Sequence, residues 1–102
     1  MRHIFQHAKK LGLRASLRIT PEIVLRPPLG KVIRRPAAIE LLRELAALDV
    51  NYRPTYARGQ HGFAEIALVP DARVGNAKRK HQKFHQVWDF LRKEGYKPVR
   101  VS

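Results

Sequence analysis

The strict two-residue alternation of residues 13–20 constrains the fold more than any other feature of this sequence. One set of alternate residues is apolar and the other is polar or basic: Leu13, Ala15, Leu17 and Ile19 against Arg14, Ser16, Arg18 and Thr20. Successive side chains of a β-strand point to opposite faces, so this pattern predicts a strand with one buried face and one basic face. A chain with such a strand must also supply a layer that covers its apolar side.

Similar patterns predict the other elements. We expect helices at Arg2–Leu11, Pro36–Asp49 and Asn76–Glu94, and strands at Leu13–Thr20, Val50–Arg58, Phe63–Val69 and Tyr96–Val101. The glycines of residues 59–62 suit the turn of a hairpin. The segment Pro21–Pro36 contains four prolines, so regular structure is not expected to persist through it, although Ile23–Leu25 suits a short extended piece.

Apart from the first helix, the predicted order is strand, helix, strand, strand, helix, strand. This order is that of the ferredoxin-like split βαβ fold (βαββαβ), in which two helices cover one face of a four-stranded antiparallel sheet. We therefore predict a single α+β domain over residues 1–102 with an extra N-terminal helix. The strand order would be 4-1-3-2, and the second face of the sheet would remain open.

The charge of the chain indicates its class of partner. Twenty-one Lys and Arg residues against eight Asp and Glu residues give a formal net charge of +13, spread from Arg2 to Arg100. A polyanion relieves the repulsion between so many like charges, and nucleic acid is favoured over an acidic protein or an anionic membrane. The chain has no cysteine and no apolar run of about 20 residues. We expect a cytoplasmic protein without a metal, a cofactor or a membrane partner.

Alternation places several cations on the open face of the predicted sheet. The proposed platform consists of Arg14, Arg18, Arg53, Phe63 and Arg100, where arginines contact phosphates and the ring stacks on a base. A second basic cluster begins the last helix, where backbone amides also favour anions: Lys78, Arg79, Lys80 and Lys83. Arg34, Arg35 and Arg58 are further candidate phosphate contacts.

The segment His61–Leu68 resembles the longer signature motif of the RNA recognition motif family. Gly62, Phe63, Ala64 and Ile66 fit this motif, whereas Glu65 stands where the family has a second stacking ring. This resemblance implies a ferredoxin-like fold that binds RNA or single-stranded nucleic acid, with Phe63 at the base-stacking position.

Residues Arg58–His61 and Lys78–Lys80 are also similar to features of double-stranded-RNA-binding domains and of HicA-type toxin ribonucleases. That resemblance implies either duplex RNA binding or RNA cleavage, with His61 as a general base and Arg58 or Lys80 beside the developing charge. No nucleophile motif or pair of acids supports catalysis, so a binding protein is favoured over an enzyme. A basic protein-interaction subunit of a ribonucleoprotein, or a mobile-element regulator, remains the alternative.

Overall fold

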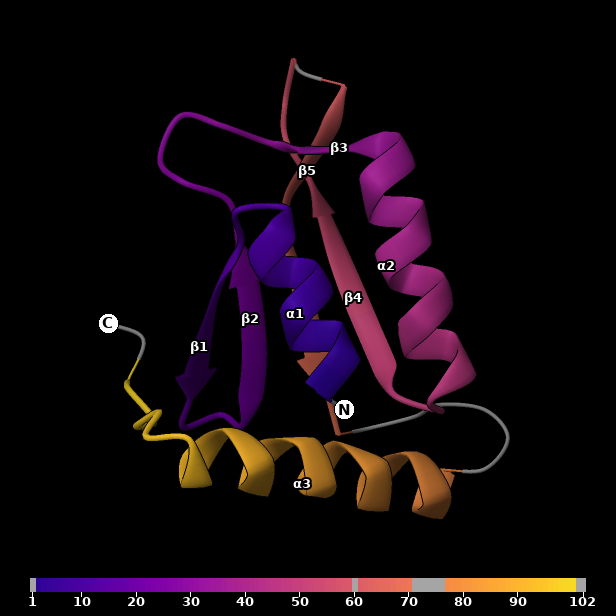
Figure 1. The fold of residues 1–102 in the computed structure, drawn as a ribbon, viewed down its shortest axis with the longest axis vertical. Helices are drawn as coiled ribbons and strands as arrows, with labels where there is room; N and C mark the ends of the chain where they lie inside the picture. The colour runs from indigo at the N-terminus through magenta and orange to yellow at the C-terminus, as the bar shows by residue number, and fades with distance from the viewer. Residues whose placement is uncertain (1, 60, 71–76, 101–102) are drawn as a thin grey trace.

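The computed structural model describes residues 2–59, 61–70 and 77–100, and it describes side chains at 3–59, 61–70 and 82–100. The elements in these ranges follow one another as shown in Figure 1: α1 (Arg2–Lys10), β1 (Arg14–Arg18), β2 (Glu22–Arg26), β3 (Ile33–Arg34), α2 (Arg35–Ala47), β4 (Asn51–Tyr56), β5 (Gly62–Val69) and α3 (Ala77–Lys93). No helix within these ranges is long and apolar enough to cross a bilayer.

The five strands form one antiparallel sheet in which β5 is central. β1 and β2 are neighbours along the sheet, and β2 pairs in turn with β5. β4 pairs along the other edge of β5, and the short β3 pairs with β5 at Gly62 and Phe63, beyond the end of β2. The outermost long strands are therefore β1 and β4, and β4 contains Pro54, which has no backbone N–H to donate.

The α+β class is confirmed, but the sheet differs from the predicted four-stranded arrangement with order 4-1-3-2. The difference comes from Glu22–Arg26, which forms a full strand between β1 and β5. The prolines on both sides of this segment end the strand and do not interrupt it. Its centre, Ile23–Leu25, is entirely buried, as expected of a strand that is covered on both faces.

The prediction of a final strand at Tyr96–Val101 is also wrong, because the described residues after α3 contain no regular strand. In its place one residue, Val99, lies against the outer edge of β1 in a parallel bridge opposite Arg18. The Val99 amide donates to the Leu17 carbonyl at 2.9 Å, and the Ile19 amide donates to the Val99 carbonyl at 3.1 Å. The C-terminal segment therefore covers part of an edge of the sheet without becoming a regular strand.

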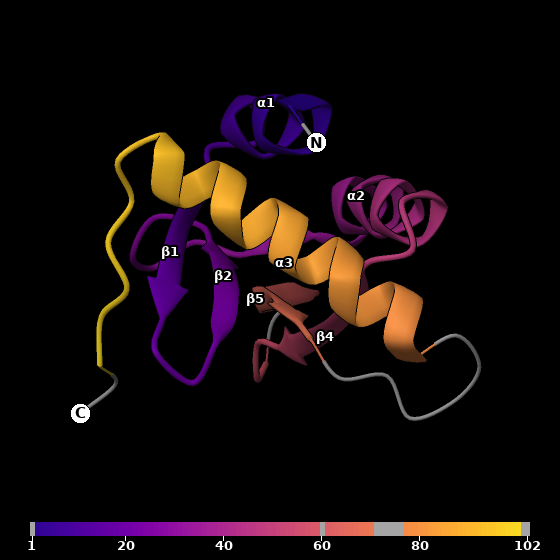
Figure 2. The same ribbon diagram turned by 90° about the horizontal axis from the view of Figure 1, so that it is seen from below.

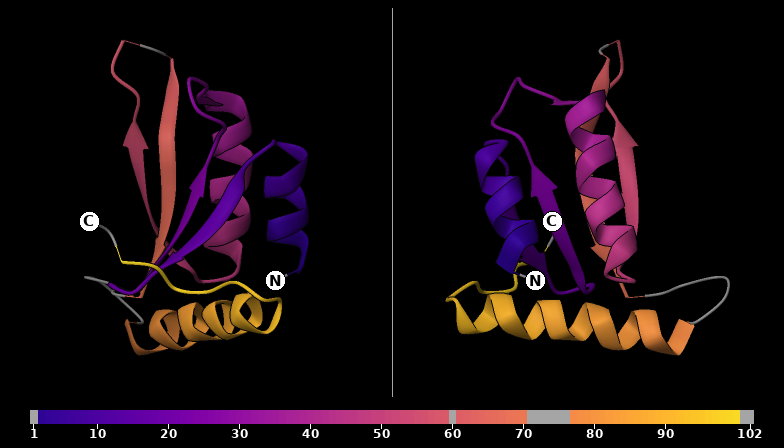
Figure 3. Two further views of the ribbon diagram at one scale, coloured as in Figure 1. Left: turned by 90° about the vertical axis from the view of Figure 1, so that its left-hand side faces the viewer. Right: turned by 45° about the vertical axis from the view of Figure 1, so that its right-hand side comes forward.

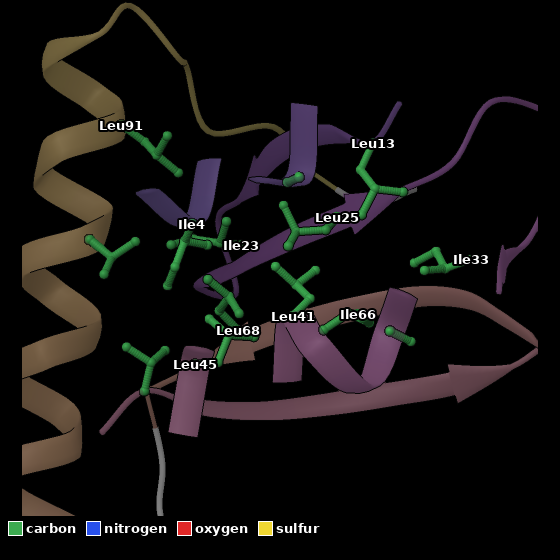
Figure 4. Packing of buried hydrophobic residues seen from close by; sticks show 14 of the residues in the cluster. Ile4, Leu13, Ile23, Leu25, Ile33, Leu41, Leu45, Ile66, Leu68 and Leu91 are labelled. Atoms are coloured by element: carbon green, nitrogen blue, oxygen red, sulfur yellow. The ribbon is translucent and has the colours of Figure 1, made fainter. Parts of the chain in front are cut away.

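The helices lie on one side of the sheet. Figures 2 and 3 show α1 and α2 against the same face, with α3 across one end of this layer. The core fills the space between helices and sheet, as Figure 4 shows, and includes Ile4, Leu13, Ile23, Leu25, Ile33, Leu41, Leu45, Ile66, Leu68 and Leu91. Burial of these aliphatic side chains supplies the main favourable term in folding.

Two local features set the entry into the sheet and into α2. Gly12 has a φ of 77° and ends α1, where the Leu13 amide donates to the Ala8 carbonyl at 2.9 Å. Pro36 lies in the first turn of α2, where its fixed φ suits a helix and its missing N–H leaves no hydrogen bond unmade. Both features lie close to where the sequence predicts a new element, a strand from Leu13 and a helix from Pro36.

Candidate nucleic-acid interface

The face of the sheet opposite the helices is defined by the strand register. Directly paired residues of an antiparallel sheet point to the same face, and the register connects one set of alternate residues from β1 across to β4. We call this surface the open face; it consists of Arg14, Ser16, Arg18, Glu22, Val24, Arg26, Asn51, Arg53, Thr55, Glu65, Ala67 and Val69. No described helix packs over it, as Figure 2 and the left view of Figure 3 show.

A small apolar cluster lies at the centre of the open face. Val24, Ala67 and Val69 form it, and all three are buried although they point away from the main core. Since no described helix covers them, the long side chains around them must do so. Arginine stems are suited to this, because their methylene groups pack on apolar surface while the charged ends reach solvent.

Two glutamates connect the arginines of the open face. Glu65 Oε1 accepts hydrogen bonds from Arg26 Nε at 3.0 Å and from Arg26 Nη2 at 2.9 Å, and lies 3.8 Å from Arg18 Nη2. Glu22 accepts a hydrogen bond from Arg53 and lies 3.9 Å from Arg18 Nη1. Each carboxylate is therefore shared by two guanidinium groups, and Arg18 joins the two halves.

Exposure differs sharply within this network. The side chains of Glu22 and Glu65 are 15% and 14% exposed, whereas those of Arg53 and Arg26 are 59% and 56% exposed. The two carboxylates and Arg18, whose side chain is 16% exposed, thus lie low on the sheet, and Arg26 and Arg53 stand above them. With Arg14, which is also exposed, the face carries four arginines and two glutamates, a net charge of +2.

The structure brings together Arg14, Arg18 and Arg53, three of the four arginines that alternation predicts on one face; the fourth, Arg100, lies outside the named strands. Arg26 and Glu22 were not predicted. Their signal is the spacing of Glu22, Val24 and Arg26, which repeats the two-residue period of the preceding strand. The neighbouring prolines obscured it.

The predicted exposure of Phe63 on the open face is wrong, because Phe63 is 5% exposed and belongs to the main core. The register shifts next to it: Thr55 pairs with Glu65, but Tyr56 pairs with Phe63, which leaves Ala64 as an extra residue in β5. Such a β-bulge reverses the alternation of the strand. Phe63 therefore points to the helix side, where its ring centroid lies 4.6 Å from that of Tyr56.

Further predicted cations lie at the end of the sheet near the β4–β5 turn. Arg34 pairs with Gly62, and because its neighbour Ile33 points into the core, Arg34 projects to the side of the open face. Arg35 begins α2 and Arg58 lies in the turn after β4; both are exposed. Arg34 is thus the predicted residue that extends the open face toward this end, where Figure 1 shows β3 beside β5.

The remaining predicted cations lie elsewhere. Lys78, Arg79 and Lys80 are in the first turns of α3, and their side chains lie outside the described residues. Lys83 is half-buried on the same helix, and Arg100 is exposed in the C-terminal segment. Arg100 follows Val99, which pairs with Arg18 at the outer edge of β1.

Among the described side chains one His–Glu pair stands out, with His7 Nδ1 lying 3.1 Å from Glu44 Oε2 on the facing helices α1 and α2. The described side chains contain no group of three or more His, Cys, Asp or Glu residues that is able to hold a metal ion. His61 is exposed beside the β4–β5 turn. Comparisons with protein-family models, curated proteins and solved structures gave no match for this chain.

Proposed function

We propose that this protein binds nucleic acid, and that the open face is the binding surface. The observation that carries the proposal is the gathering of Arg14, Arg18, Arg26 and Arg53 on a sheet face that no described helix covers. Guanidinium groups donate hydrogen bonds in a planar fork that matches phosphate oxygens. Arg34 extends the same surface toward the β4–β5 turn.

The shared carboxylates support this proposal for a geometric reason. Glu22 and Glu65 hold Arg26 and Arg53 in place, while more than half of each arginine side chain stays exposed. An arginine that is already oriented loses less side-chain entropy when it binds a phosphate. The net charge of +13 adds long-range attraction for a polyanion.

A binding titration at several salt concentrations tests the proposal. If four arginines each neutralise one phosphate, log affinity falls with log salt at a slope of about −3.6 on a duplex and about −2.8 on a single strand. A slope near zero, or no binding at about 50 mM salt, contradicts the proposal.

A pair of variants locates the surface. The double variant Arg14→Ala, Arg53→Ala removes two cations from the open face, and the control Arg43→Ala, Arg92→Ala removes two exposed cations from α2 and α3. We expect the first to weaken binding and to reduce the salt slope by about 1.8 on a duplex, because each lost phosphate contact removes about 0.9. Equal losses in both variants would mean that charge alone, and not this face, determines binding.

A further inference from the structure

The positions of the aromatic side chains bear on which form of nucleic acid the open face fits. The chain has one Trp, three Tyr and four Phe residues, and the structure describes the side chains of all of them: Phe5, Tyr52, Tyr56, Phe63, Phe84, Trp88, Phe90 and Tyr96. None of these residues belongs to the open face.

Each ring lies on the helix side or at its margin. Most are buried in the main core or pack against it: Phe5, Tyr52, Phe63, Phe84, Trp88 and Phe90. Tyr56 is 66% exposed at the end of β4, beside the bulge, with its ring plane tilted by 33° from that of Phe63, and Tyr96 lines a cleft between α1, β1 and α3. The open face therefore presents guanidinium, carboxylate, hydroxyl and amide groups, but no Phe, Tyr or Trp ring.

We infer that the nucleic acid bound by the open face is double-stranded. This inference rests on the proposed function and specifies its ligand. Proteins that hold unpaired strands place exposed rings under successive bases, and each such stack contributes about 1 to 3 kcal/mol. A face without rings loses that contribution on a single strand but loses nothing on a duplex, whose bases are already stacked on each other.

Charge density favours the duplex as well. Neighbouring strands are about 4.8 Å apart, so the span from β1 to β4 across the sheet is about 14 Å. A duplex presents one phosphate charge per about 1.7 Å of its axis and a single strand one per about 3.4 Å. Along this span a duplex therefore carries about twice the phosphate charge of a single strand, which strengthens its long-range attraction for the exposed arginines.

The polar groups of the open face also suit the edges of paired bases. Arginine donates to guanine O6 and N7 in the major groove, and a glutamate accepts from the cytosine amino group. Arg26 and Arg53 are the groups placed to make such contacts, since more than half of each side chain is exposed, whereas Glu65 and Glu22 lie low on the sheet and accept hydrogen bonds from these arginines. Recognition of this kind needs a groove and does not need a stacking ring.

The cleft between α1, β1 and α3 is a competing site for an unpaired strand, and it also provides a control variant. It is lined by Phe5, Phe90 and Tyr96 together with Lys9 and Arg14, which are the groups that an unpaired base and its phosphate would use. Tyr96 is 40% exposed, so Tyr96→Ala removes a ring from this cleft with little effect on the core. We expect this variant to bind a duplex as tightly as the unchanged protein.

The test is a set of fluorescence-anisotropy titrations with four probes at one salt concentration: a DNA duplex of about 20 base pairs, the RNA duplex of the same sequence, and one separate strand of each. At about 3.4 Å per base pair, these duplexes are longer than the protein, whose largest extent is 36 Å. We expect at least one duplex to bind tenfold or more tightly than its own strand.

Three results separate the two proposals. If the single strands bind as tightly as the duplexes, or more tightly, and Arg53→Ala alone, which leaves the lining of the cleft unchanged, still weakens binding, the duplex inference is wrong and the proposed function stands. Loss of single-strand binding in Tyr96→Ala would then assign the unpaired base to the cleft. If none of the four probes binds, the proposed function itself is wrong. The two duplex probes also show which sugar the face prefers.

Discussion

Gly62 lies where β3 approaches β5 most closely. A Cβ atom at this position would be 2.6 Å from the Ile33 carbonyl oxygen and 2.9 Å from Val32 Cγ2, and the nearer of these is a backbone atom that has to move. We predict that Gly62→Ala destabilises the protein by about 1 to 3 kcal/mol through overpacking. Urea unfolding measures this loss, and Ser16→Ala on the exposed part of β1 is a control that should change stability by less than about 0.5 kcal/mol. An unchanged midpoint in Gly62→Ala would mean that β3 is free to withdraw from β5.

Phe63, the next residue, shows what the sequence pattern does not contain. Alternation counted back from Glu65 places Phe63 on the open face, and the single extra residue Ala64 reverses that assignment. A bulge is a property of two paired strands, so one strand read alone carries no sign of it. Arg14, Arg18 and Arg53 lie in stretches of β1 and β4 without a bulge, and their shared face was predictable for that reason.

At the scale of elements, Glu65 links β5 to the arginines of β1 and β2. It is paired with Arg26 and lies close to Arg18. We predict that Glu65→Gln has opposite effects on two measurements. Stability falls by about 1 kcal/mol, because charge-assisted hydrogen bonds are lost and the neighbouring arginines repel one another. Affinity for nucleic acid rises, because the net charge of the open face increases from +2 to +3 while the glutamine amide oxygen still accepts a hydrogen bond from Arg26 and keeps it oriented.

The matched control for Glu65→Gln is Glu40→Gln, which removes the same charge from an exposed position on α2. Urea unfolding and a salt titration of binding measure the two effects. A rise in affinity as large in Glu40→Gln as in Glu65→Gln would contradict a local role for the open face. A gain in stability in Glu65→Gln would show that burying this carboxylate costs more than its ion pairs return.

The helices and most strands were predictable because each has a clear period of its own. β2 was not assigned as a strand because its centre, Ile23–Leu25, is a continuous apolar run set between prolines, which hides the two-residue spacing of Glu22, Val24 and Arg26. Such a run is typical of a strand buried on both faces. One face of β2, however, is covered by side chains from the same sheet and not by a helix. No periodicity in the sequence predicts that kind of cover. In the C-terminal segment the pattern predicts a strand that the structure does not contain. Val99 and Val101 alternate with polar residues, but only Val99 pairs in the described residues.

For the whole molecule, the net charge of +13 opposes folding, since it brings like charges together. We predict that sodium chloride stabilises this protein: the urea midpoint rises between about 0.05 and 0.5 M salt, because the Debye length falls well below about 10 Å. The ion pairs of the open face are screened too, but they involve few of the 21 cations. A midpoint that falls with added salt would mean that those ion pairs outweigh the general repulsion.

The two margins of the sheet affect how copies of this protein behave when they crowd on one polyanion. Polyanions concentrate cationic proteins, and at high local density an unpaired strand edge invites another sheet to join it. Here Val99 occupies hydrogen-bonding groups along β1, and Pro54 interrupts the row of donors along β4. Neighbouring copies on a shared strand of phosphates therefore find no continuous ladder to extend, so dense loading is compatible with each copy remaining separately folded and free to dissociate.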